Sequence, residues 1–153
     1  MFKFQNHIVI NKPVEEVFRF TADMSNVPLW NYYVRSVEPT SKDPNEAGAT
    51  FHQIRKNDEQ DLKLVDIKPN DSFIIETIPP STPELRREML FIKEGGGTKI
   101  IDRWQLDLGV PKLLEPLAAN RAKNGVKQNL NKLKVLLETG KVELQDGRTF
   151  SLG

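Results

Sequence analysis

The fold is decided by Pro111–Glu138, which has the sequence PKLLEPLAANRAKNGVKQNLNKLKVLLE. Its apolar residues recur at the i, i+3, i+4 spacing that places side chains on one buried face of a helix. These residues are Leu114, Ala118, Ala122, Val126, Leu130, Leu133 and Leu137. The pattern predicts a single long amphipathic helix over residues 111–138.

The middle of this apolar stripe is unusually small. Ala118, Ala119, Ala122 and Gly125 lie between bulkier residues at either end. Two interpretations follow. Small residues let a helix pack closely on a sheet, or they border a cavity that side chains of the sheet do not fill. A cavity under a long helix would favour the binding of a small molecule, with Ala118, Ala122 and Gly125 at its border.

The chain before this helix has the pattern of an antiparallel meander. A first strand is expected at residues 2–10, followed by two short helices at 13–23 and 26–30. Short β-rich runs then alternate with turn signals, which predicts six more strands. These strands are expected at 34–40, 48–56, 61–68, 72–78, 84–93 and 98–108. We expect one domain over 1–140 and a tail over 141–153, which forms a short β-hairpin around Gln145–Gly147 or frays.

Composition excludes several classes of function. The chain has 153 residues, a formal net charge of +1, no cysteine and two histidines. A charge near zero gives no field that attracts nucleic acid, and no apolar run is long enough to cross a membrane. His7 and His52 without cysteine do not make a zinc site. We therefore expect a cytoplasmic protein with no metal or cofactor, either a monomer or a homodimer. The basic residues of the last helix are expected to form a solvated face.

Asp102 is the strongest candidate for a chemical role. A turn at Gly95–Gly97 pairs residue 89 with 102 and residue 87 with 104, so Arg87, Asp102 and Trp104 share one face. That face is the apolar one and is expected to point toward the long helix. Asp102 then serves as a ligand anchor or a general acid or base, or it forms a structural ion pair with Arg87 or Arg55. In a different strand register, Asp102 would face water instead. His52 is expected to face outward.

Short motifs resemble those of the START-like superfamily, in its polyketide cyclase/dehydrase-like, or SRPBCC, branch. Pro13–Phe18 (PVEEVF) is similar to the start of the first helix, and Met24–Trp30 (MSNVPLW) is similar to the second. Gly48–Phe51 and Gly97–Thr98 are similar to strand openings of the same family. The resemblance covers about residues 2–138. It implies an α+β helix-grip fold, in which a seven-stranded antiparallel sheet wraps around a long C-terminal helix, with two short helices after the first strand.

The resemblance also implies an apolar cavity between the sheet and the last helix. Combined with the strand faces, it predicts which residues contact a ligand there. They are Trp30, Tyr33, Phe51, Gln53, Arg55, Phe73, Ile75, Arg87, Met89, Asp102, Trp104, Leu114, Ala118 and Ala122. Trp30 has an alternative role as a core residue where the short helices meet the sheet.

Three functional hypotheses remain open. The first is a cofactor-free protein that binds a hydrophobic or aromatic small molecule of lipid or polyketide type. The second is an enzyme of cyclase/dehydratase type that uses Asp102 with Arg87 or Arg55. The third is a protein-interaction module that uses the basic last helix and the C-terminal tail. An apolar cavity would favour the binding protein. An unpaired buried carboxylate that faces the cavity would favour the enzyme, and a filled core would favour the interaction module.

Overall fold

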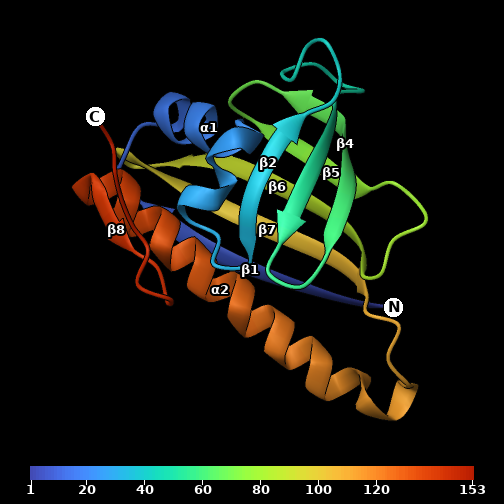
Figure 1. Cartoon of the computed structure of the whole chain (residues 1–153). Coiled ribbons are helices and arrows are strands. Elements are labelled where there is room, and N and C mark those ends of the chain that lie inside the picture. The colour runs from blue at the N-terminus through green and yellow to red at the C-terminus, as the bar shows by residue number, and fades with distance from the viewer.

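The computed structural model describes residues 1–153, and its elements follow the predicted order (Figure 1). They are β1 (Phe2–Ile10), α1 (Val14–Ala22), the 3-10 helix η1 (Met24–Leu29), β2 (Val34–Pro39), β3 (Thr50–Arg55), β4 (Glu59–Lys68), β5 (Ser72–Thr77), β6 (Glu84–Glu94), β7 (Gly97–Asp107), the 3-10 helix η2 (Lys112–Leu114), α2 (Glu115–Thr139), β8 (Lys141–Glu143) and β9 (Thr149–Ser151).

Strands β1 to β7 form one antiparallel sheet in the order β1-β7-β6-β5-β4-β3-β2, so β1 and β2 are its edges. The long helix α2 packs against this sheet, mainly on the edge strand β1, and the predicted helix-grip fold is confirmed. The predicted pairing of β6 with β7 is also confirmed, with Arg87 opposite Trp104 and Met89 opposite Asp102. A register shift between Leu64 and Asp66 produces a bulge in β4.

Helix α2 is one continuous element with two different environments. Its C-terminal half carries Leu130, Leu133 and Leu136, which are completely buried in the core. Its N-terminal half extends past the lower ends of the central strands in Figure 1, and Leu117 there is exposed. The predicted start at residue 111 is corrected, because 112–114 form a separate 3-10 turn before Glu115. Gly140 ends the helix with a positive φ of 81°, which glycine adopts without steric cost.

The basic residues of α2 include two that bond to the sheet. Lys127 Nζ donates to the His7 carbonyl oxygen at 2.6 Å, and Lys134 Nζ donates to that of Val9 at 2.5 Å. In the opposite direction, Asn6 Nδ2 donates to the Lys123 carbonyl oxygen at 3.1 Å. The edge strand β1 therefore has backbone acceptors covered by α2, which corrects the expectation that these lysines only face solvent.

Residues 141–153 form a hairpin rather than a frayed tail. Strands β8 and β9 pair with each other, and Val142 and Leu144 are buried against the core. Arg148 Nη2 donates to the Tyr32 carbonyl oxygen at 2.9 Å, which joins the hairpin to the segment that precedes β2. The C-terminal segment is thus part of the packed structure that supports α2.

Candidate ligand cavity

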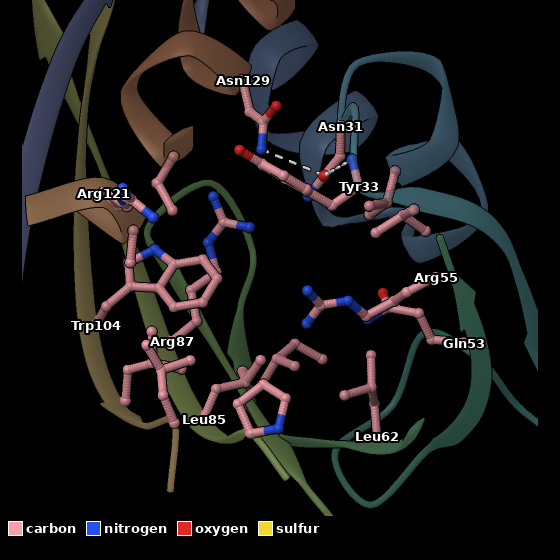
Figure 2. A pocket seen from close by; sticks show the side chains of 18 of the residues that line it. Asn31, Tyr33, Gln53, Arg55, Leu62, Leu85, Arg87, Trp104, Arg121 and Asn129 are labelled. Atoms are coloured by element: carbon pink, nitrogen blue, oxygen red, sulfur yellow. Dashed lines mark hydrogen bonds between the residues drawn. The ribbon is translucent and has the colours of Figure 1, made fainter. Parts of the chain in front are cut away.

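A cavity of about 490 Å³ lies between the sheet and the N-terminal half of α2. It is lined by 27 residues, of which 19 are hydrophobic, so most of its wall offers only apolar contacts. The wall includes residues of strands β3 to β7 on one side and of η1 and α2 on the other. Figure 2 shows the polar side chains that interrupt this apolar surface. The volume is in the range of about 300–1,000 Å³ that is typical of small-molecule sites.

Most of the residues predicted to contact a ligand lie on the cavity wall. They are Trp30, Tyr33, Gln53, Arg55, Phe73, Ile75, Arg87, Met89, Trp104, Leu114, Ala118 and Ala122. Phe51 does not reach the cavity and belongs to the hydrophobic core. It points inward as expected, but only the later inward residues of β3, Gln53 and Arg55, extend far enough along the strand to line the wall.

The small residues of α2 have two different roles. Ala118 and Ala122 line the cavity, as expected from the stripe of small side chains. Gly125 does not, because the Tyr33 ring occupies the space beside it. A Cβ atom at position 125 would lie 2.7 Å from the Tyr33 hydroxyl oxygen, so glycine permits this close contact. The expectation that Gly125 borders the void is therefore corrected, since an aromatic side chain fills that part.

Arg87 and Asp102 form a buried ion pair beside the cavity. Arg87 Nε donates to Asp102 Oδ1 at 2.8 Å, and Arg87 Nη2 donates to Oδ2 at 2.7 Å. The guanidinium carbon of Arg87 also lies 4.7 Å from the Trp104 ring centroid and 5.4 Å from that of Trp30. The bidentate ion pair with Asp102 and the two aromatic rings hold the Arg87 guanidinium in one orientation.

Asp102 itself is shielded from the cavity. The residue is 0% exposed, both carboxylate oxygens accept from Arg87, and it does not line the wall. Its predicted inward direction is correct, but the residue does not line the cavity, because the Arg87 side chain is bonded to both carboxylate oxygens and itself lines the wall. Trp30 is 1% exposed, belongs to the hydrophobic core and also lines the cavity. The two positions expected for it, in the core and at the cavity, are therefore compatible.

Four polar residues of the wall were not predicted: Thr21, Asn31, Arg121 and Asn129. Asn129 Nδ2 donates to Asn31 Oδ1 at 3.2 Å (Figure 2). Asn129 Oδ1 accepts from the Tyr32 backbone N–H at 3.2 Å. The pair ties α2 to the segment before β2. A signal for Asn129 is present in the sequence, since it lies seven residues after Ala122, at a spacing that returns to the apolar stripe. Arg121 belongs to the basic set that is expected to face solvent.

The cavity opens near the start of α2. Val110, Leu114 and Leu117 line it there and are also exposed to solvent. Leu113, in the same 3-10 turn as Leu114, is 91% exposed. The entrance therefore has an apolar rim, supplied by the connection from β7 to α2.

His52 lies outside the cavity, on the opposite side of the sheet, as expected from the strand alternation. Its Nδ1 is 2.9 Å from Asp61 Oδ1 and its Nε2 is 3.1 Å from Glu59 Oε2. The hydrogen bond to Asp61, together with the negative charges of both carboxylates, raises the pKa of His52 above its ordinary value of 6.5. No group of three or more histidine, cysteine or acidic side chains is arranged to hold a metal ion.

Comparison with known proteins places the chain in a described family. The family of polyketide cyclases, dehydrases and lipid transport proteins matches residues 1–138. No curated protein matches the chain. No helix in the structure has both the length and the hydropathy needed to cross a membrane.

Solved structures with low sequence identity share the fold. The protein TTHA0849 of Thermus thermophilus is 17% identical with a TM-score of 0.71, over 90% of this chain and 99% of its own. A START superfamily protein of Mycobacterium smegmatis is 10% identical with a TM-score of 0.72, over 88% of this chain and 98% of its own. The di-domain ARO/CYC protein StfQ of the steffimycin biosynthetic pathway is 15% identical with a TM-score of 0.65, over 88% of this chain and 44% of its own.

Proposed function

Because the chain belongs to the polyketide cyclase/dehydrase and lipid transport family, we propose that it binds a hydrophobic or aromatic small molecule of lipid or polyketide type in the cavity under α2. The observation that carries this proposal is the cavity itself. A volume of about 490 Å³ with a mostly apolar wall leaves apolar surface that a ligand of matching size would cover. A filled core, which would favour a pure interaction module, is not present.

The alternative of a cyclase/dehydratase-type enzyme has less support from the site. A general acid or base must lie within hydrogen-bond reach of its substrate. Asp102 is completely buried behind Arg87, and both of its oxygens are already bonded to that side chain. Arg87 and Asp102 therefore fit the role of an anchor that orients a bound ligand better than that of a proton-transfer pair.

The proposal is tested with N-phenyl-1-naphthylamine, an uncharged aromatic probe whose fluorescence rises in apolar surroundings. The protein is expected to bind it with a saturable signal. Replacing Ala122 by Leu adds three carbon atoms to the cavity wall and is expected to weaken binding about tenfold, with a loss of stability below the roughly 1–3 kcal/mol that overpacking costs in a filled core.

Ala119→Leu is the matched control for this experiment. Ala119 lies on the same helix and is partly exposed, but it does not line the cavity. The same enlargement there should leave the dissociation constant unchanged. Absence of saturable binding by the unmodified protein would contradict the proposed function, and equal effects of both substitutions would place the probe elsewhere on the molecule.

A further inference from the structure

Three arginine side chains lie on the wall of the mostly apolar cavity. Arg55 comes from the end of β3, Arg87 from β6 and Arg121 from α2, and Figure 2 shows them approaching the same space from different sides. No aspartate or glutamate side chain lines the cavity. The charges that a ligand would meet in this cavity are therefore all positive.

The three guanidinium groups differ in how far the protein satisfies them. Arg87 is 9% exposed and uses Nε and Nη2 on Asp102, while its Nη1 donates to no protein atom. Arg55 Nε lies 3.5 Å from Asp58 Oδ1, but this geometry gives no hydrogen bond and both atoms are buried without a bonded partner. Arg121, which is exposed at the cavity, forms neither an ion pair nor a hydrogen bond. Donor capacity therefore remains unused on all three.

Two buried indole groups add to this surplus of donors. Trp30 Nε1 and Trp104 Nε1 are buried, and neither has a hydrogen-bond partner. Both tryptophans line the cavity, and both rings lie against the Arg87 guanidinium. Indole and guanidinium groups can only donate hydrogen bonds, so the groups that can pair with them here are acceptors such as the oxygen atoms of water or of a ligand. A buried donor that is left unpaired costs about 1–3 kcal/mol.

We infer that the ligand has an apolar body and an anionic oxygen-bearing end, such as a carboxylate, that binds between Arg55, Arg87 and Arg121. This inference rests on the proposed binding function and specifies the ligand class. An anionic group accepts several hydrogen bonds at once and reduces the repulsion between like charges in a cavity of low dielectric constant. Asp102 fixes the orientation of Arg87, so that its remaining N–H groups are available without a rearrangement.

A matched pair of probes separates the anion from the apolar body. N-phenyl-1-naphthylamine and 8-anilino-1-naphthalenesulfonate share one aromatic framework, and only the second carries a sulfonate. Both are titrated against the unmodified protein and against Arg121→Met and Arg55→Met, which keep an apolar stem and remove the charge. Arg19→Met is the control, because Arg19 is exposed on α1 and has no ion pair.

The expected result is selective. Arg121→Met and Arg55→Met should each raise the dissociation constant of the sulfonate probe about tenfold or more, the usual effect of losing a charge-assisted hydrogen bond. The dissociation constant of the uncharged probe should rise much less in these variants. Arg19→Met should leave the dissociation constants of both probes unchanged. The sulfonate complex should also weaken as salt concentration rises.

Two results would overturn the inference in distinguishable ways. If both probes bind the unmodified protein and each arginine variant changes their dissociation constants by the same factor, the inferred anion site is refuted. The proposed function then still stands. If neither probe binds, the proposed function fails and the inference falls with it. Circular dichroism of each variant verifies that it is folded. Because Arg55 and Arg121 are each substituted singly, one misfolded variant would leave the other as the test.

Discussion

At the residue scale, the Arg87–Asp102 pair connects the stability of the sheet to the shape of the site. Burying two charges is costly, and the pair is tolerated because its geometry satisfies both carboxylate oxygens. Removing one partner leaves the other charge buried. Asp102→Asn is therefore expected to lower the free energy of unfolding by about 3–5 kcal/mol, measured by urea denaturation.

Asp71→Asn provides the comparison for this substitution. Asp71 is exposed in the turn between β4 and β5, and its carboxylate makes no hydrogen bond or ion pair, so the expected change is within about 0.5 kcal/mol. An Asp102→Asn protein as stable as the unmodified one would show that the carboxylate faces solvent. In that case Arg87 would also lose its fixed orientation toward the ligand.

His52 gives a prediction for pH dependence at the same scale. Its pKa is raised chiefly by the hydrogen bond to Asp61, so the folded state binds this proton more tightly than the unfolded chain does. The resulting stabilisation is fully present below pH 6.5 and is lost as the pH rises through the folded-state pKa. An NMR titration should find the pKa of His52 above 6.5 and lower in Asp61→Asn. A titration unchanged by that substitution would refute the assigned cause.

At the scale of elements, α2 shows why a single helix both stabilises the fold and leaves space. Its second half packs into the core through fully buried leucines, including Leu130 and Leu133. Its first half offers Ala118 and Ala122, which are too short to reach the opposite strands. The helix remains in place over the cavity because Asn129, Lys127 and Lys134 bond it to neighbouring segments.

The tail hairpin is a second element whose attachment is testable. Arg148 Nε donates a hydrogen bond to Asp146 Oδ2, and Lys56 Nζ lies 3.8 Å from the same Asp146 oxygen. Hydrogen bonds from Arg148, and then the charges of Arg148 and Lys56, hold the pKa of Asp146 below its ordinary value of 3.8. A lowered folded-state pKa stabilises the fold above that ordinary value and ceases to do so as the pH falls through the folded-state pKa.

Asp146→Asn is therefore expected to lower the melting temperature at pH 7. The difference from the unmodified protein should shrink as the pH is lowered below 3.8, because the native carboxylate then becomes protonated too. Differential scanning fluorimetry across this range measures the effect. A difference that stays constant with pH would mean that the substitution acts through packing and not through charge.

At the scale of the whole molecule, the cavity results from where the helices lie on the sheet. Helix α2 packs mainly along the edge strand β1, and η1 packs on β2 at the opposite edge. Side chains of the strands between these edges line the space that the two helices leave between them. Tyr33 fills one part of that space beside Gly125, and the remainder stays open for a ligand.

The sequence by itself determined the seven strands of the large sheet, the two short helices and the long helix, their order, and the pairing of β6 with β7. These depend on local sterics: the 3.6-residue period of α2, the two-residue alternation of strands, and a tight turn that brings Met89 opposite Asp102. The same alternation predicts that Arg87 and Trp104 share a face. Local patterns identify the inward faces, and together with the family resemblance, which implies the cavity, they place most of the candidate residues on its wall.

Only the tertiary structure decided which of these side chains remain available. Asp102 is hidden because Arg87 covers it, and the space near Gly125 is filled because Tyr33 folds back from a distant segment. The meeting of Arg55, Arg87 and Arg121 has the same origin, since they lie on separate elements far apart in the chain. A cavity forms where elements that are far apart in the sequence pack together without filling the space between them. Local sequence periodicity does not specify how such elements pack.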